Sequence, residues 1–320
     1  MKHLPLAGLL VCCFTTSAAV AQSYPDRVVR LVVPYAAGGS ADIAARLIAD
    51  VWAQKLGASM IIENRAGAGG NIGVDNVAKS KPDGYTIGLQ TVSLAINPAL
   101  FPQMPYDTLN DLAPIGMIAS SQHVLVTNRG LPVSNLRELI AAAKAEPGKL
   151  NYGSAGVGST FHMSAELFKS VADVQIGHVP YRGGGPALID TIGGQVDMSF
   201  PVISAAAQHV TGGKLNALAV TGRERSALLP DVPTAAEAGL PDYAFDTWFM
   251  AFAPAGTPDD VIAKLNASLN AALSSDAVRE RMIKEGFDPT PGTPQAAAQQ
   301  LRDEMPKWAQ LIKDRGITAE

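Results

Sequence analysis

The chain has 320 residues and a formal net charge of −4, with 25 basic and 29 acidic side chains. That length predicts about two domains, and the slight acidic excess argues against a nucleic-acid-binding protein, which needs a basic face. Apolar residues make up 47% of the chain and charged residues 17%, so intrinsic disorder is also excluded.

The N-terminus has the three parts of a secretory signal peptide. Lys2 precedes an apolar run, Leu4–Phe14, and the small-residue sequence Ala19-Val20-Ala21 matches the usual cleavage site. Polar residues end the apolar run well before the ~20 residues that a membrane anchor needs. We therefore expect residues 1–21 to be removed on export to the periplasm, together with both cysteines, Cys12 and Cys13. Lipid attachment at a cysteine is the weaker alternative, because neither cysteine follows Gly, Ala or Ser.

Short apolar strands alternate with amphipathic helices in the first part of the chain. The pattern predicts strands at Val28–Pro34, Met60–Glu63 and Tyr85–Gln90, with helices over 41–55 and 71–79 between them. A turn of small residues at 36–40 and a glycine loop at 67–70 precede the two helices. This alternation indicates an α/β fold.

The same order of elements occurs a second time. Strands are predicted at Leu150–Gly153, Gln175–Pro180 and Met198–Phe200, separated by a Gly/Ser turn at 154–159, a glycine loop at 183–185 and two helices. The repetition predicts two similar α/β lobes. In each lobe, helix N-termini would lie at the carboxyl ends of the strands, where open α/β sheets bind ligands.

Two long apolar segments, Ala113–Asn128 and Tyr243–Ala253, are expected to cross between the lobes. On this reading, residues 22–120 and 250–320 form lobe 1, and residues 121–249 form lobe 2. Trp248 and Phe249 lie on the second crossing segment, as core residues or as an aromatic wall at the hinge. Pro306 is expected to kink or break the last helix near Met305.

The turns Gly38–Asp42 and Gly153–Thr160 are the best candidates for ligand binding. Each follows a strand and precedes a helix, so free backbone N–H groups and the helix dipole would attract an anion. A small carboxylate could be held from both lobes without an arginine. The alternative is that each is an ordinary tight turn with capping side chains.

Other chemistries have weaker support in the sequence. The glycine loop at 67–70 lacks the third glycine of a dinucleotide fingerprint, which would fall on Ile72. A hydrolase using Ser154, His162 and Asp197 stays open, although the G-x-S-x-G nucleophile motif is absent. No metal site and no cofactor are predicted. The histidines beyond the signal peptide do not form an H-E-x-x-H motif, and both cysteines would be removed with the signal peptide.

Taken in order, a series of short motifs resembles the substrate-binding receptors of tripartite tricarboxylate transporters, the Bug receptor family. The resemblance covers nearly all of the chain beyond the predicted signal peptide. It runs through 24–27, 34–42, Glu63-Asn64-Arg65, 82–85, Asn97-Pro98, 150–154, 178–181, 193–197, 229–234 and 252–258.

The resemblance implies a periplasmic-binding-protein (Venus-flytrap, type II-like) fold. Each lobe would be a mixed sheet flanked by helices, and two crossing strands would join the lobes. It implies that the protein is not an enzyme but binds a small carboxylate, an organic acid or an amino acid, in the cleft between the lobes. The contacts it implies are Ala37, Gly38, Gly39, Asp42 and Thr91 in lobe 1, and Ser154, Gly158, Ser159, Thr160, Tyr181 and Asp197 in lobe 2.

The resemblance also implies partners. We expect a small carboxylate ligand and integral membrane transporter subunits, no nucleic acid, and a monomeric receptor. A periplasmic sensor that binds a receptor kinase instead is the alternative that the sequence leaves open. Pro201 and Val202 stand where many relatives carry Asp-Asn, so the contact to the far end of the ligand departs from the family pattern.

Overall fold

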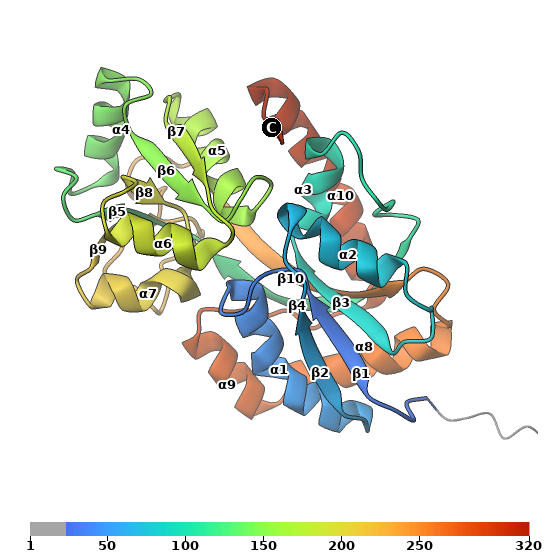
Figure 1. The fold of residues 1–320 in the computed structure, drawn as a ribbon. Helices are drawn as coiled ribbons and strands as arrows, with labels where there is room; N and C mark the ends of the chain where they lie inside the picture. The colour runs from blue at the N-terminus through green and yellow to red at the C-terminus, as the bar shows by residue number, and fades with distance from the viewer. Residues whose placement is uncertain (1–23, 320) are drawn as a thin grey trace, which may run out of the picture.

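The computed structural model describes residues 24–319, so the predicted signal peptide lies outside the described residues. The chain forms two α/β lobes, each built on one mixed sheet (Figure 1). The predicted two-lobed fold class is therefore confirmed. Within residues 24–319 no helix has both the length and the apolar character needed to cross a membrane.

Lobe 1 is built on a six-stranded sheet with the order β11-β4-β10-β3-β1-β2. Strands β1, β2 and β3 are parallel, whereas β10 runs antiparallel between β3 and β4. The short strand β11 pairs with the outer edge of β4. The strands are β1 (Val29–Val33), β2 (Met60–Asn64), β3 (Thr86–Thr91), β4 (Leu112–Gln122), β10 (Asp246–Pro254) and β11 (Asp288–Pro289).

Helices cover both faces of the lobe 1 sheet. One face packs against α1 (Ser40–Leu56), α8 (Asp259–Leu273) and α9 (Asp276–Lys284). The other packs against α2 (Asn71–Ala78), which follows the short helix η1 (Ala68–Gly70), and against α3 (Ser93–Leu100) and α10 (Pro294–Arg315). The result is a three-layer lobe with an apolar cluster on each side of the sheet.

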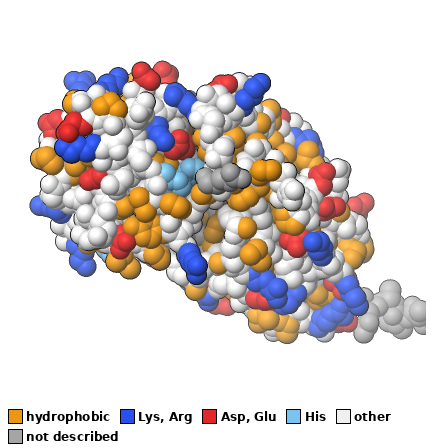
Figure 2. All heavy atoms as spheres, turned by 45° about the horizontal axis from the view of Figure 1, so that its top comes forward, with side chains coloured by type: hydrophobic (Ala, Val, Ile, Leu, Met, Phe, Trp, Pro, Cys, Tyr) orange, Lys and Arg blue, Asp and Glu red, His pale blue; other side chains and the backbone are white. Residues whose placement is uncertain are grey.

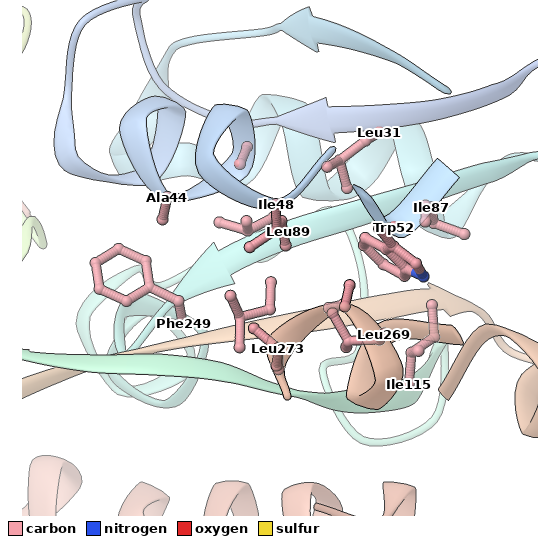
Figure 3. Close-up of a cluster of buried hydrophobic side chains, with 14 of the residues drawn as sticks. Leu31, Ala44, Ile48, Trp52, Ile87, Leu89, Ile115, Phe249, Leu269 and Leu273 are labelled. Carbon is pink, nitrogen blue, oxygen red and sulfur yellow. The ribbon is translucent and has the colours of Figure 1, made fainter. Parts of the chain in front are cut away.

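Trp52 of α1 is the largest side chain in the first of these clusters (Figure 3). It is fully buried, and its indole N–H lies 3.0 Å from Ser268 Oγ on α8. Around it lie strand residues such as Leu31 and Ile87 and helix residues such as Leu269. This packing fixes α1, and with it the turn that precedes α1, against the sheet.

Lobe 2 is built on a five-stranded sheet with the order β7-β6-β8-β5-β9. Strands β6, β7 and β8 are parallel, and β5 is antiparallel to both β8 and β9. The strands are β5 (Val124–Asn128), β6 (Asn151–Ser154), β7 (Gly177–Pro180), β8 (Met198–Ser199) and β9 (Leu215–Val220). The helices are α4 (Leu136–Ala145), α5 (Thr160–Ala172), α6 (Gly184–Ile192) and α7 (Ile203–Thr211).

The lobes are joined where β4 continues into β5 and where β10 returns to lobe 1 (Figure 1). His123 lies between β4 and β5, fully buried, and its ring contacts both connections. Its Nδ1 donates to the Phe200 carbonyl at 2.7 Å, and its Nε2 lies 2.5 Å from Thr247 Oγ1 on β10. Trp248 and Phe249, also on β10, are buried in the lobe 1 clusters, so they are core residues and not an exposed wall.

Helix α10 runs without a break from Pro294 to Arg315 and contains Pro306. Of the kink or break predicted near Met305, the break is therefore wrong. The reason is tertiary packing, because Leu301 and Ile312, on either side of the proline, are buried in the same apolar cluster. Burial of both ends holds the helix together across the backbone hydrogen bond that the proline cannot donate.

Candidate functional site

The first wall of the candidate site is the turn between β1 and α1. Helix α1 begins after Gly39 without a side-chain cap, so the backbone N–H groups of its first turn are not used by a capping side chain. Gly38 has φ +81°, a left-handed conformation that favours glycine. The predicted contacts Ala37, Gly38 and Gly39 all belong to this turn.

The side chain of Asp42 stabilises this turn by hydrogen bonding to its backbone. Its carboxylate accepts hydrogen bonds from Gly38 N at 2.9 Å, Arg46 Nε at 2.9 Å and Asn64 Nδ2 at 3.0 Å. Burial alone would raise the pKa of Asp42, but the hydrogen bonds from Arg46, Gly38 and Asn64 outweigh it and lower the pKa. Asp42 is therefore an ionised brace for the turn, and it does not lie on the wall of the cavity.

Thr91, at the end of β3, connects this wall to lobe 2. Its hydroxyl oxygen lies 3.2 Å from the Tyr35 hydroxyl and donates to Ser93 Oγ at 3.3 Å. Ser93 Oγ in turn donates to the Gly158 carbonyl of lobe 2 at 3.0 Å. A short chain of hydroxyl groups thus runs from the candidate site to a contact between the lobes.

The second wall is the turn between β6 and α5. Ser159 caps α5 by accepting a hydrogen bond from His162 N, and Gly158 has φ +76°. A Cβ on Gly158 would lie 2.9 Å from Asn97 Oδ1 of lobe 1, so a side chain here would push the lobes apart. This explains why glycine occupies the position where the turn meets α3.

Two histidines, the buried His162 and the half-buried His178, support this second turn. His162 Nδ1 accepts a hydrogen bond from Gly158 N at 3.2 Å, and His178 Nε2 lies 2.6 Å from Ser154 Oγ. Their rings stack with centroids 4.3 Å apart. Burial lowers the pKa of His162 to about 4 and that of His178 to about 3, so both imidazoles are neutral near pH 7.

A third glycine turn, at the start of α6, completes the lobe 2 side. Gly183 precedes α6 with φ +138° and provides no side-chain cap. A Cβ on Gly184 would lie 2.7 Å from the Phe161 ring, so α6 approaches the first turn of α5 as closely as the backbone allows. The sequence shows this glycine loop, but we did not predict it as a contact.

These walls enclose a cavity of about 500 Å³ between the lobes. Six of the predicted contacts line it: Ala37, Gly38, Gly39, Thr91, Ser159 and Thr160. Lining residues that sequence reasoning missed come from α1, α5, α6, α7 and the residue after α9, and include Ile43, Phe161, Gly185, Ile189, Ser204, Gln208, His209 and Glu285. Helices α7 and α9 lie outside the repeated pattern, so no sequence signal placed them here.

The other predicted contacts lie off the cavity wall. Tyr181 donates its hydroxyl to Asp190 at 2.8 Å, and burial together with this carboxylate raises the pKa of Tyr181 to about 12. Asp197 precedes β8 and accepts from Asn151 N at 2.8 Å. Because β6 and β8 are parallel, Asp197 and Asn151 lie at the amino ends of the strands, the edge opposite the cavity. Ser154 and Gly158 belong to the second turn but do not line the cavity.

The proposed Ser154–His162–Asp197 arrangement is not assembled in this structure. Ser154 is fully buried and contacts His178, whereas His162 Nδ1 accepts from a backbone N–H and Asp197 lies at the far edge of the sheet. A nucleophile needs both a base within hydrogen-bond reach and access to substrate. The geometry therefore does not support the hydrolase alternative.

Lysine and arginine are absent from the described residues that line the cavity. Basic and acidic side chains are instead interspersed over the outer surface, as the face in Figure 2 shows. An anion in the cavity would therefore depend on backbone N–H groups and on the positive ends of α1, α5 and α6.

Two α/β lobes with a cavity between them, lined by helix N-termini from both sides, define a two-lobed solute-binding protein. The sequence model of the family described as tripartite tricarboxylate transporter family receptor matches residues 44–317. The chain therefore belongs to this family of receptors, which confirms the resemblance noted from its motifs.

Individual relatives agree with this assignment. Protein BugT of Bordetella pertussis is 39% identical over 318 residues, covering 98% of each chain. Among solved structures, Rpa4515 of R. palustris with adipate has a TM-score of 0.88 at 37% identity, covering 92% of this chain and 99% of that one. MatC from Rhodopseudomonas palustris with bound malate has a TM-score of 0.85 at 35% identity, covering 90% and 100% of the two chains.

Proposed function

We propose that this protein is a periplasmic receptor that captures a small carboxylate between its lobes and delivers it to the membrane subunits of a tripartite tricarboxylate-type transporter. The family assignment supports a solute receptor. Two similar structures, solved with adipate and with malate, support a carboxylate as the ligand. The signal-peptide pattern in residues 1–21 supports export to the periplasm.

The observation that carries the proposal is the convergence of three helix N-termini, two of them uncapped, on one cavity. Helices α1 and α6 both start there without side-chain caps, and α5 starts there with Ser159 and Thr160 on the wall. Each N-terminus offers backbone N–H donors and a partial positive charge, and each contributes about 0.3–1 kcal/mol toward an anion, or up to ~2 kcal/mol when partly buried. Three such ends favour a carboxylate over a neutral or cationic solute.

Binding at micromolar affinity requires about −8 kcal/mol. The helix ends supply part of this, and direct hydrogen bonds from the hydroxyl groups of Ser159 and Thr160 supply more, at about 0.5–1.5 kcal/mol each. Exclusion of water from the apolar lining adds the rest. Closure of the lobes then follows from tighter binding to the closed form, by the difference in affinity between the two forms.

A calorimetric screen of organic acids and amino acids tests the proposal. We expect at least one carboxylate to bind, and Ala37→Glu to weaken it at least about tenfold, because the new carboxylate would face the ligand's charge. Ala141→Glu, on an exposed face of α4, is the matched control and should bind normally. Failure of every carboxylate to bind, or normal binding by Ala37→Glu, would contradict the proposal.

A further inference from the structure

The motif Glu63-Asn64-Arg65 lies outside the cavity, at the end of β2. Strand β2 is an edge strand of the lobe 1 sheet and lies next to β1 (Figure 1). Neighbouring side chains of a strand point to opposite faces of its sheet. Glu63 forms ion pairs with Arg65 and with Arg30 of β1, whereas Asn64 contacts the turn between β1 and α1. The middle residue of the motif is therefore the one that reaches the candidate site.

The side-chain amide of Asn64 joins three parts of lobe 1. Its Nδ2 donates to the Tyr35 carbonyl, just beyond β1, and to Asp42 Oδ1, each at 3.0 Å. Its Oδ1 accepts from Arg46 Nη2 at 3.4 Å. One side chain of β2 therefore ties the end of β1 to the first turn of α1. We call Asp42, Arg46 and Asn64 the Asp42 network.

The Asp42 network decides which N–H groups of the turn are free. Gly38 N donates to Asp42 Oδ2 at 2.9 Å, and Gly39 N donates to a carbonyl within the turn at 3.4 Å. Both glycine N–H groups are therefore occupied. Ser40 and Ala41 begin α1, where the helix has no acceptor for their N–H groups and no side chain caps it. Both residues line the cavity, so their N–H groups are the donors that this turn offers to an anion.

The charge of Asp42 requires partners for a second reason. Its buried, ionised carboxylate lies on the helical turn whose N–H groups would hold an anionic ligand. Without compensation, this negative charge would repel the ligand, most strongly where water is excluded. Arg46 places its Nε 2.9 Å from the carboxylate, and Asn64 adds a second donor. Together they offset the charge while the carboxylate keeps its hydrogen bond to the turn.

Lobe 2 has the same construction with an uncharged acceptor. There too a glycine N–H of the turn donates to a side chain four residues further on, from Gly158 to His162 Nδ1 at 3.2 Å. At the strand position that Asn64 occupies in lobe 1, β7 has Pro180, which has no side-chain donor. Burial keeps His162 neutral by lowering its pKa to about 4, so it needs no charge partner. The comparison indicates that the donors around Asp42 serve its charge.

We propose that Asn64 is a positioning residue for the ligand. Acting through Asp42, it holds the turn in the shape that leaves the N–H groups of Ser40 and Ala41 free, and it offsets the negative charge next to them. It does this without contacting the ligand. This inference rests on the proposed function, because it assumes that an anion binds at the start of α1.

Asn64→Leu tests the inference, because leucine has nearly the same shape and no polar atoms. Calorimetry on the full protein after signal removal would use acetate, malate, adipate and hexanoate as probes. We expect the variant to bind every probe that the wild type binds about five- to tenfold more weakly, because the donors are no longer fixed and the charge is less well compensated. Hydrogen exchange at the Gly38 amide, measured by NMR, should be at least about tenfold faster. Loss of stability alone would leave the affinity of the folded protein unchanged.

Arg46 provides a second test that does not disturb the core, because its side chain is exposed. Arg46→Gln should weaken binding about three- to tenfold by leaving the carboxylate without its cation. Arg46→Lys keeps the positive charge and should bind within about twofold of the wild type. Glu63→Gln is the matched control, since Glu63 is the chain neighbour of Asn64 and pairs away from the turn. It should change neither the affinities nor the exchange at Gly38.

The outcomes separate this inference from the proposed function. If Asn64→Leu and Arg46→Gln bind the probes as the wild type does, even with faster exchange at Gly38, the inference is overturned and the carboxylate receptor stands. An equal loss in Glu63→Gln would overturn it too, because the loss would then follow from disturbing β2. If Asn64→Leu does not fold, the two Arg46 variants decide. If the wild type binds none of the four probes, the tightest-binding acid of the wider screen replaces them. If no carboxylate binds at all, the proposed function fails and the inference fails with it.

Discussion

Asp42 illustrates how a residue predicted as a ligand contact can support the binding turn without lining the cavity. Its place two residues after Ser40 marks the first turn of a helix, where an acidic side chain often caps free N–H groups. The structure places its carboxylate under the turn, where it binds Gly38 N, and away from the cavity. The sequence predicts the residue and its turn, but the direction of the side chain depends on Arg46 and Asn64, whose approach is a tertiary effect.

His123 gives a prediction about stability in acid. Burial lowers the pKa of His123 to about 4, against about 6.5 for a histidine in the unfolded chain. Below pH 6.5 the unfolded chain therefore binds a proton that the folded protein does not. The free energy of unfolding should fall by about 1.4 kcal/mol per pH unit for such a histidine as the pH drops toward 4.

Urea denaturation at several pH values measures this effect. The slope of the unfolding free energy against pH, between pH 6 and pH 5, should be lower in His123→Gln than in the wild type by about that amount. Above pH 7 the two proteins should show parallel profiles, which serves as the internal control. Equal slopes at low pH, or an imidazole NMR signal for His123 that titrates near pH 6.5, would contradict the prediction.

At the scale of elements, local patterns were most informative where a strand, a glycine turn and a helix follow one another. Periodicity and glycine placement predicted β1, α1, β2, α2 and β3 and their lobe 2 counterparts to within a few residues. Elements outside this pattern, such as α7 and β11, have no comparable signal, and β11 is only two residues long. The part of the cavity lined by α7 could therefore not be predicted from the sequence.

Pro306 provides a prediction at the same scale. It lies at an exposed position inside α10, where it removes one helical hydrogen bond and crowds the preceding turn. Pro306→Ala should stabilise the protein by about 2 kcal/mol, because the gain in the helix exceeds the extra freedom of the unfolded chain. Gln310→Ala, another exposed position on α10, should change stability by less than about 0.5 kcal/mol in the same denaturation experiment. A destabilised Pro306→Ala protein would show that the packed helix requires a proline-induced distortion.

For the whole molecule, the relation of the lobes depends on a few contacts outside the cavity. Ser93 donates to the Gly158 carbonyl on one side, and Arg315 of α10 donates to the hydroxyl and carbonyl oxygens of Ser170 on α5. Both contacts join lobe 1 to lobe 2 directly. The internal repeat predicted two lobes and the segments that cross between them, but contacts between lobes depend on single side chains that no periodic pattern marks.

Arg315→Ala tests whether these contacts hold the lobes together. We expect a larger radius of gyration by small-angle X-ray scattering without ligand, and ligand affinity about two- to tenfold lower, because part of the binding energy must then close the lobes. Arg302→Ala, exposed on the same helix and bonded only to Gln299, is the control. An unchanged radius and affinity in Arg315→Ala would show that the contact between Arg315 and Ser170 does not help to hold the lobes together.

The position of β10 has a consequence for how the protein would assemble after the export that we propose. Lobe 2 is one continuous stretch of chain inserted between β4 and β10, and its two ends meet where His123 contacts Thr247. Its sheet can form as soon as that stretch has emerged from the membrane. In the sheet of lobe 1, β10 (Asp246–Pro254) lies between β3 and β4. The sheet therefore cannot be completed until β10, which is distant in sequence, pairs with both strands. We therefore expect the second lobe to mature first, and the first lobe to stay incomplete until late in translocation.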